Sequence, residues 1–185
     1  MLRSDVLVIG CGIAGGTAAL ELAEAGLEVT VITRADRAGE SNTYWAQGGI
    51  IFRGENDSPE SLAQDIVNAG AGLCHEQAVR TLADEGPSLV QAILIDRLGV
   101  PFDRTPDGKL ALGREGGHSI ARIVHATDAT GRAIEEKLVA AVRARPNVHV
   151  LTLKEEADWA RDSLEKLPGV LKIYQTTVGQ GARLL

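Results

Sequence analysis

The sequence has few cysteines and aromatic residues, no block of basic residues and no long apolar run. Its two cysteines, Cys11 and Cys74, cannot form a disulfide framework, and their separation fits no metal-binding pattern. We therefore expect a reduced, cytoplasmic setting and no metal site. The net charge is -6 without a basic cluster, which argues against a nucleic-acid-binding surface. No apolar run could cross a bilayer, so we expect no membrane partner.

What is present is enough apolar material for a core. The 185 residues are 44% hydrophobic, sufficient for one domain or a large part of one. The first residues lead directly into an apolar run and do not have the pattern of a signal peptide. We find no internal repeat and no low-complexity segment.

The segment 10–15 has the spacing G-x-G-x-x-G and stands between a predicted strand at 6–9 and a predicted helix that closes at Gly26. A second strand is predicted at 29–32. This strand, turn, helix and strand order is what makes the glycine spacing specific for a dinucleotide. The alternative is a glycine-rich turn that binds nothing. The candidate ligand-contacting residues of this turn are Gly10, Cys11, Gly12, Ile13, Ala14 and Gly15.

Each glycine of this turn has a separate physical purpose. Gly10 permits a sharp turn out of the strand, and Gly12 allows a pyrophosphate to approach the backbone. Gly15 allows close packing of helix and strand. The helix start then presents N–H groups and a partial positive charge to the phosphates. Cys11 is interpreted as a small filler and not as a reactive thiol.

The acidic residue that usually ends the second strand of a dinucleotide fold is missing. Thr33 and Arg34 stand there instead. Thr33 could hydrogen-bond a ribose hydroxyl, and Arg34 could meet the 2′-phosphate of NADP. The fingerprint by itself leaves FAD, NAD and NADP open.

Helical patterns follow over about 58–98. Ser58 is a predicted N-cap, a second helix is predicted from His75, and Pro87 is predicted to open a third. This block is interpreted as an all-α insertion. A further helix from an N-cap at Thr130 leads to a predicted third parallel strand at 148–151, so the fold class is α/β, Rossmann-like, with a parallel sheet.

Three loops have the composition of binding sites. The loop 35–49 follows the second strand, where ligands bind in such folds, and either wraps a cofactor or fills a surface gap with its aromatics. In 114–119, Arg114 could bind a carboxylate and Glu115 an ammonium group or a proton, unless the two form a surface ion pair. For 125–132, capping by Asp128 and Thr130 is favoured over catalysis.

Together these segments resemble the L-aspartate oxidases of the succinate dehydrogenase/fumarate reductase flavoprotein family, in order from about residue 4 to about residue 157. The segments that carry the resemblance are GCGIAG at 10–15, SNTYWAQGGI at 41–50, NAGAGLC at 68–74, REGGHS at 114–119 and HATDATGR at 125–132. The resemblance implies a Rossmann-like FAD-binding fold. It also implies FAD in place of NADP, with Thr33 and Arg34 near the adenosine and Ala157 near the adenine.

The resemblance also implies how the flavin is held. Succinate dehydrogenases have a flavin-bonding histidine where this chain has Asn42, so noncovalent FAD is expected. The residues that the resemblance places along the flavin are Asn42, Thr43, Tyr44, Trp45, Ala46, Gln47, Gly48 and Gly49.

The implied reaction is oxidation of L-aspartate to iminoaspartate, with oxygen or fumarate as the electron acceptor. Iminoaspartate would pass to quinolinate synthase in NAD biosynthesis. Glu115 is the expected catalytic and substrate-binding residue, because its charge matches the α-amino group; Arg114 and His118 are expected to bind substrate.

The family's enzymes are longer, so 1–185 is predicted to be an incomplete, N-terminal part of the FAD-binding domain, inactive alone. The alternatives are a flavoprotein of this family that acts on succinate or fumarate, and a non-catalytic dinucleotide-binding module.

Overall fold

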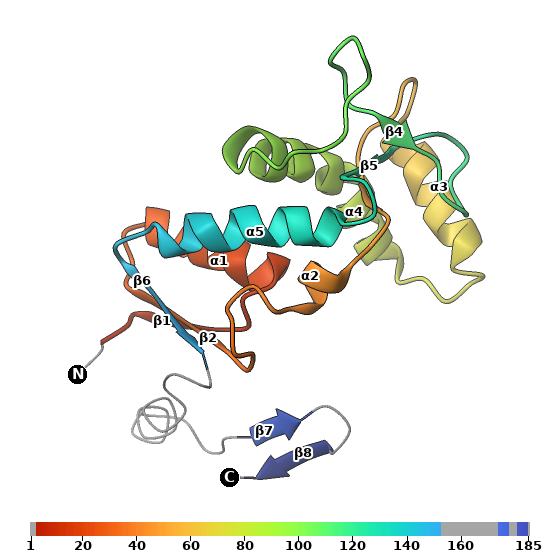
Figure 1. The fold of residues 1–185 in the computed structure, drawn as a ribbon. Helices are drawn as coiled ribbons and strands as arrows, with labels where there is room; N and C mark the ends of the chain where they lie inside the picture. Colours follow the sequence, from red (N-terminus) through yellow and green to blue (C-terminus); the bar gives the residue numbers. More distant parts are fainter. Residues whose placement is uncertain (1–2, 153–173, 178–180, 185) are drawn as a thin grey trace. The chain divides into compact units, whose positions relative to one another are not determined.

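The computed structural model describes residues 3–152, 174–177 and 181–184. The chain separates into two compact units (Figure 1). Unit 1 contains residues 1–41 and 142–185, and unit 2 contains residues 42–141.

Unit 1 has a parallel three-stranded sheet. Its strands are β1 (Val6–Ile9), β2 (Val29–Thr33) and β6 (Val148–Thr152), in the order β1-β2-β6. The strand predicted at 148–151 is therefore the third parallel strand, with Val29 of β2 in register with Val148. The central strand is mostly buried, as its run of β-branched residues predicts.

Helix α1 (Ile13–Glu24) connects β1 to β2 and packs against both strands. Its buried face consists of small and aliphatic residues, which allow close approach to the sheet: Gly16, Ala19, Leu20 and Ala23. The helix ends as predicted, since Gly26 has φ +84° just after the C-cap Ala25. The Asn147 amide donates to the carbonyls of Ala23 and Leu27, at 2.9 and 2.8 Å, and thereby ties the start of β6 to this turn.

Unit 2 contains the predicted helices. They are α3 (Pro59–Ala69), α4 (Glu76–Leu89) and a π-helical segment η1 (Val90–Arg97) that continues α4 directly. Ser58 caps α3 as predicted, because its hydroxyl accepts from Ser61 N at 3.1 Å. His75 is exposed and caps α4 through Nδ1, which accepts from Ala78 N at 3.3 Å.

The prediction that Pro87 opens a third helix is wrong, because Pro87 lies inside α4. A proline in a helix removes the N–H that would bond the carbonyl four residues earlier, here that of Ala83. That carbonyl instead accepts from Arg53 Nη2 at 3.1 Å. A side chain from a distant segment therefore replaces the missing bond, and the helix continues through the proline.

Unit 2 also has a small antiparallel sheet. Its strands are β3 (Gly49–Ile51), β5 (Ile123–His125) and β4 (Leu112–Gly113), in the order β3-β5-β4. Residues 105–108 form a turn, with a bridge between Arg104 and Leu110, whereas the residues at 100–102 form no strand.

Three further elements complete the described structure. They are the short helix α2 (Asn42–Trp45), the helix α5 (Thr130–Arg143) and a hairpin of β7 (Tyr174–Thr177) with β8 (Gly181–Leu184). No helix in the described part of the chain has both the length and the apolarity to span a bilayer.

Candidate functional site

The glycine-rich turn of unit 1 has a backbone conformation and a packing that require glycine. Gly10 has φ +102°, a conformation that side chains disfavour, and its N–H donates to Ile32 O at 2.8 Å. A Cβ on Gly15 would lie 2.1 Å from Gly10 O, so only glycine permits this packing of helix and turn. Gly12 is the N-cap of α1 and places no side chain at the helix start. Cys11 is 2% exposed, consistent with a filler.

Thr33 and Arg34 stand at the carboxyl end of β2, in the same unit. Thr33 is buried, and its hydroxyl accepts from Ala35 N at 3.4 Å. Arg34 is exposed. The contacts of both residues with an adenosine stay predictions, and Ala157 lies outside the described residues.

The loop expected along the flavin begins as α2 and is fixed to the start of α5. Gly131 N donates to Ala46 O at 3.0 Å, and the Thr130 hydroxyl donates to Gly48 O. A Cβ on Gly131 would lie 1.9 Å from Thr43 O, so the two segments pack backbone against backbone. Trp45 is 68% exposed and meets Tyr44 edge to face, with ring centroids 5.1 Å apart.

The prediction that Thr130 is the N-cap of the helix is wrong. Thr130 is the first helical residue, and its hydroxyl accepts from Ala126 N at 3.0 Å while donating to Gly48 O. The hydroxyl thus binds Gly48, which lies 82 residues earlier in the chain, and does not cap the helix. The segment 125–132 is therefore an anchor for the loop 42–49.

His125 belongs to the same anchor. Its Nδ1 lies 3.0 Å from Asp103 Oδ2, and that carboxylate oxygen also accepts from Thr127 N at 2.9 Å. Thr127 has φ +46°, which the Asp103 contact helps to hold.

Glu115 lies directly beside the loop 42–49. Gly48 has φ +63°, and a Cβ there would lie only 2.8 Å from Glu115 Oε1. The structure therefore brings the predicted flavin loop and the predicted substrate carboxylate together within one unit. Glu115 and Arg114 are both exposed.

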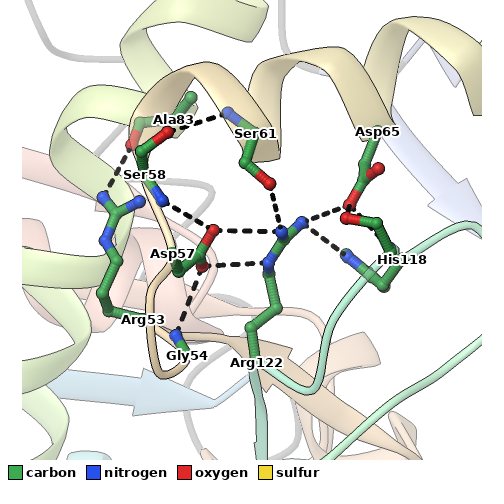
Figure 2. Close-up of polar contacts among 10 residues, drawn as sticks. Arg53, Gly54, Asp57, Ser58, Ser61, Asp65, Ala83, His118 and Arg122 are labelled. Atoms are coloured by element: carbon green, nitrogen blue, oxygen red, sulfur yellow. Dashed lines mark hydrogen bonds and ion pairs between the residues drawn. The ribbon is translucent and has the colours of Figure 1, made fainter.

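A buried ionic cluster that joins α3 to the end of the loop 114–119 was missed by the sequence analysis (Figure 2). Arg122 is 0% exposed and lies between α3 and the loop 114–119. Its Nε and Nη2 bond the two oxygens of Asp57, each at 3.0 Å, and Nη1 bonds Asp65 at 2.6 Å. Nη2 also donates to the Ser61 hydroxyl at 3.1 Å, and Nη1 lies 3.3 Å from His118 Nδ1.

Asp65 also fixes the loop backbone. Its Oδ2 accepts from the N–H of Ser119 at 2.8 Å and from the Ser119 hydroxyl at 2.9 Å. The Ser119 N–H lowers the pKa of Asp65 below its usual value, and the Ser119 hydroxyl and Arg122 act in the same direction, while burial opposes them. Asp65 is therefore held as a carboxylate, and it attaches Ser119 directly to α3.

The sequence did contain a signal for this cluster. Asp65 lies among the apolar residues of α3, next to the buried Leu62 and Ala63, and Arg122 comes directly before the buried strand β5. Opposite charges on two apolar segments are expected to pair when they are buried.

Comparison with known proteins identifies the family. The family model described as FAD binding domain matches residues 5–168. The chain belongs to the FAD-binding domain family of the succinate dehydrogenase and fumarate reductase flavoproteins. Its cofactor is therefore FAD. The interpretation of Arg34 as a selector for NADP does not hold.

Relatives in this family include L-aspartate oxidases. That of Streptomyces coelicolor is 47% identical over 164 residues, which covers 85% of this chain and 28% of the relative. L-aspartate oxidase 2-a of Nicotiana tabacum, a chloroplastic protein, is 51% identical over 148 residues, which covers 79% of this chain and 22% of the relative. The chain thus spans about a quarter of the length of these two relatives.

Solved structures of the family share the fold. An E. coli quinol fumarate reductase matches with a TM-score of 0.73 and 28% identity, over 80% of this chain and 26% of that one. The Sdh1 complex of Mycobacterium smegmatis matches with a TM-score of 0.71 and 30% identity, over 80% of this chain and 27% of that one. The α/β fold with a parallel sheet, incomplete relative to the family, is thereby confirmed.

Proposed function

We propose that this chain is the N-terminal part of an FAD-dependent L-aspartate oxidase, which converts L-aspartate to iminoaspartate. The observation that carries the proposal is the position of Glu115, whose Oε1 would lie 2.8 Å from a Cβ on Gly48, so that a carboxylate stands beside the loop expected to follow the flavin. Relatives named L-aspartate oxidase, 40–51% identical to this chain, support the choice of substrate.

The residues of unit 1 that fit the cofactor are those of the glycine-rich turn. Gly10, Gly12 and Gly15 leave the start of α1 open to a diphosphate, whose charge the helix dipole favours. In unit 2, Asn42 cannot form the covalent flavin bond that a histidine makes, so we propose noncovalent FAD. Denaturation with acid should release all of the flavin, and flavin retained on the chain would contradict this.

The charged and polar residues of the loop 114–119 bind the substrate and orient it. FAD, when bound, accepts the hydride from the substrate. Glu115 holds the α-ammonium group and accepts a proton from it, because a carboxylate is an acceptor at neutral pH. Arg114 binds a substrate carboxylate with two parallel hydrogen bonds, and His118 donates a further one.

The cellular context is also a proposal. Oxygen or fumarate takes the electrons, and the iminoaspartate passes to quinolinate synthase in cytoplasmic NAD biosynthesis. The segment 1–185 is proposed to be the N-terminal part of one FAD-binding domain, with the helices at about 58–98 as its insertion.

Glu115→Gln in the full-length enzyme tests the substrate assignment. Glutamine keeps the size of the side chain and removes its charge, so the KM for aspartate should rise about 10- to 100-fold, while succinate binding changes little. Glu85→Gln, at an exposed position of α4, is the matched control and should change neither. Equal losses for aspartate and succinate would remove Glu115 from its amino-group role.

A succinate- or fumarate-converting flavoprotein is the second candidate, because solved fumarate reductase and Sdh1 structures share this fold. Steady-state turnover of succinate that exceeds turnover of aspartate would favour it.

A further inference from the structure

Arg122 is held more rigidly than a side chain that only fills space. Its guanidinium is fully buried and bonds two carboxylates and a hydroxyl, all from the segment 57–65. Asp57 is itself fixed, because its oxygens accept from Gly54 N at 3.2 Å and Ser58 N at 2.9 Å. The orientation of the guanidinium is therefore set before any ligand arrives.

One contact of Arg122 reaches the loop 114–119, which is proposed to bind the substrate, and this contact is the one with His118 (Figure 2). Arg122 Nη1 lies 3.3 Å from Nδ1 of this histidine. A guanidinium has only N–H donors and no acceptor. Nδ1 must therefore accept, and it carries no proton. In the neutral imidazole, the ring proton is then on Nε2.

We propose that Arg122 is a positioning residue that holds His118 as an Nε2–H donor for a carboxylate oxygen of the substrate. Asp65 supports this arrangement, because it binds Arg122 and also accepts hydrogen bonds from the backbone N–H and the hydroxyl of Ser119, the residue next to His118. The identity of the acceptor rests on the proposed function, whereas the tautomer of His118 is a property of this chain alone.

The direct test is nitrogen NMR of the chain labelled with ¹⁵N-histidine, at about pH 8, above the usual titration range of histidine. The chain has four histidines, and His118→Gln identifies the His118 signals by their loss. We expect an unprotonated Nδ1 and a protonated Nε2. A protonated Nδ1 in the wild-type chain would overturn the inference, whatever the enzyme does.

Arg122→Lys tests whether Arg122 sets the tautomer. Lysine keeps the positive charge but lacks the planar fork that bonds Asp57, Asp65 and His118 together. The His118 nitrogen signals should therefore shift toward a mixture of the two tautomers. Arg80→Lys is the matched control, because it makes the same substitution at an exposed position of α4 and should leave these signals in place. Unchanged signals in Arg122→Lys, or equal shifts in both variants, would overturn the role of Arg122.

The third measurement is the Kd for succinate in His118 variants. It needs no Arg122 variant and therefore still tests the proposal if Arg122→Lys does not fold. In the full-length enzyme, succinate serves as the probe for the carboxylate site. The amide N–H of glutamine can take the place of Nε2–H, and that of asparagine can take the place of Nδ1–H. His118→Gln should keep the Kd for succinate within about threefold, and His118→Asn should raise it at least about tenfold.

Equal Kd values for these two variants would overturn the assignment of a carboxylate to Nε2–H. The expected tautomer and the expected difference in Kd, found in an enzyme that does not oxidise aspartate, would support the inference and contradict the proposed function.

Discussion

At the scale of single residues, the absence of a side chain at Gly48 has two consequences: it permits a positive φ, and it leaves room for the carboxylate of Glu115. The φ of +63° at Gly48 costs an alanine about 1 kcal/mol, and the space where a Cβ would lie is occupied by the carboxylate of Glu115. Because Oε1 is at the end of a flexible side chain, Glu115 would move and the loop would not.

Gly48→Ala should therefore weaken aspartate binding in the full-length enzyme by about tenfold and destabilise the chain by about 1 kcal/mol. Gly108→Ala is the matched control, because Gly108 has φ +84° and, apart from its two chain neighbours, no residue lies within 4 Å of the position that the alanine methyl group would take. It should cost similar stability and leave the KM unchanged. A raised KM in both variants would show that backbone strain, and not Glu115, is responsible.

Asp65 gives the chain a pH dependence at the same scale. Its pKa is lowered in the folded state, mainly by the Ser119 N–H, so it adds stability above its unfolded pKa of about 3.8. This stability is lost as the pH falls from about 4 through the lower, folded pKa. Asp65→Asn removes the charge at every pH.

Asp65→Asn should lower the free energy of unfolding by about 2 kcal/mol at pH 7, since the buried Arg122 loses a partner. The difference from wild type should shrink below about pH 4, as wild-type Asp65 itself becomes neutral. Urea titrations between pH 7 and pH 3 measure it. Asp84→Asn, at an exposed position, should stay within about 0.5 kcal/mol of wild type, and a difference for Asp65→Asn that grows in acid would contradict the account.

At the scale of elements, the start of α5 acts as the anchor of the loop 42–49. The Thr130 hydroxyl is bonded on both sides, to Ala126 N and to Gly48 O. Gly131 adds the bond to Ala46 O. The helix thus positions the loop 42–49, which we propose to follow the flavin, through its first two residues, and the bonds to Gly48 O and Ala46 O join residues that are far apart in sequence.

Thr130→Val keeps the side-chain shape and removes both hydrogen bonds. The buried Ala126 N–H loses its partner, so the variant should be less stable by about 1–3 kcal/mol and bind FAD about tenfold more weakly. Fluorescence titration with FAD and urea unfolding measure the two effects. Thr105→Val removes hydroxyl bonds at an exposed turn and should leave FAD affinity intact. Unchanged FAD affinity in Thr130→Val would contradict the anchor.

The elements also show what a sequence can predict. The parallel strands and the helices at 59–69 and 130–143 follow from apolar periodicity and from local caps such as Ser58, which the sequence displays directly. Pro87 was misinterpreted because its effect is compensated by Arg53, more than 30 positions away. Arg122 was missed for the same reason, since its partners Asp57 and Asp65 lie 65 and 57 residues before it.

At the scale of the whole molecule, the chain spans 28% and 22% of the lengths of two L-aspartate oxidase relatives. The charges proposed to hold aspartate, on Arg114 and Glu115, are exposed. Water and salt compete at exposed charges, and such ion pairs contribute about 0–1 kcal/mol each. Two such ion pairs supply about 2 kcal/mol at most, whereas a Kd of about 1 mM requires about 4 kcal/mol, so they are too weak to hold aspartate at millimolar concentration.

The chain of 185 residues should therefore not oxidise L-aspartate by itself, even when FAD is supplied. The measurement is peroxide release in air with added FAD and L-aspartate, and the full-length enzyme under identical conditions is the positive control. Calorimetry with L-aspartate separates the two possible causes of inactivity, because exposed charges predict no measurable binding, whereas a purely chemical defect predicts binding without turnover. Peroxide release from the chain above the level of a Glu115→Gln variant would show that residues 1–185 already contain a working substrate site.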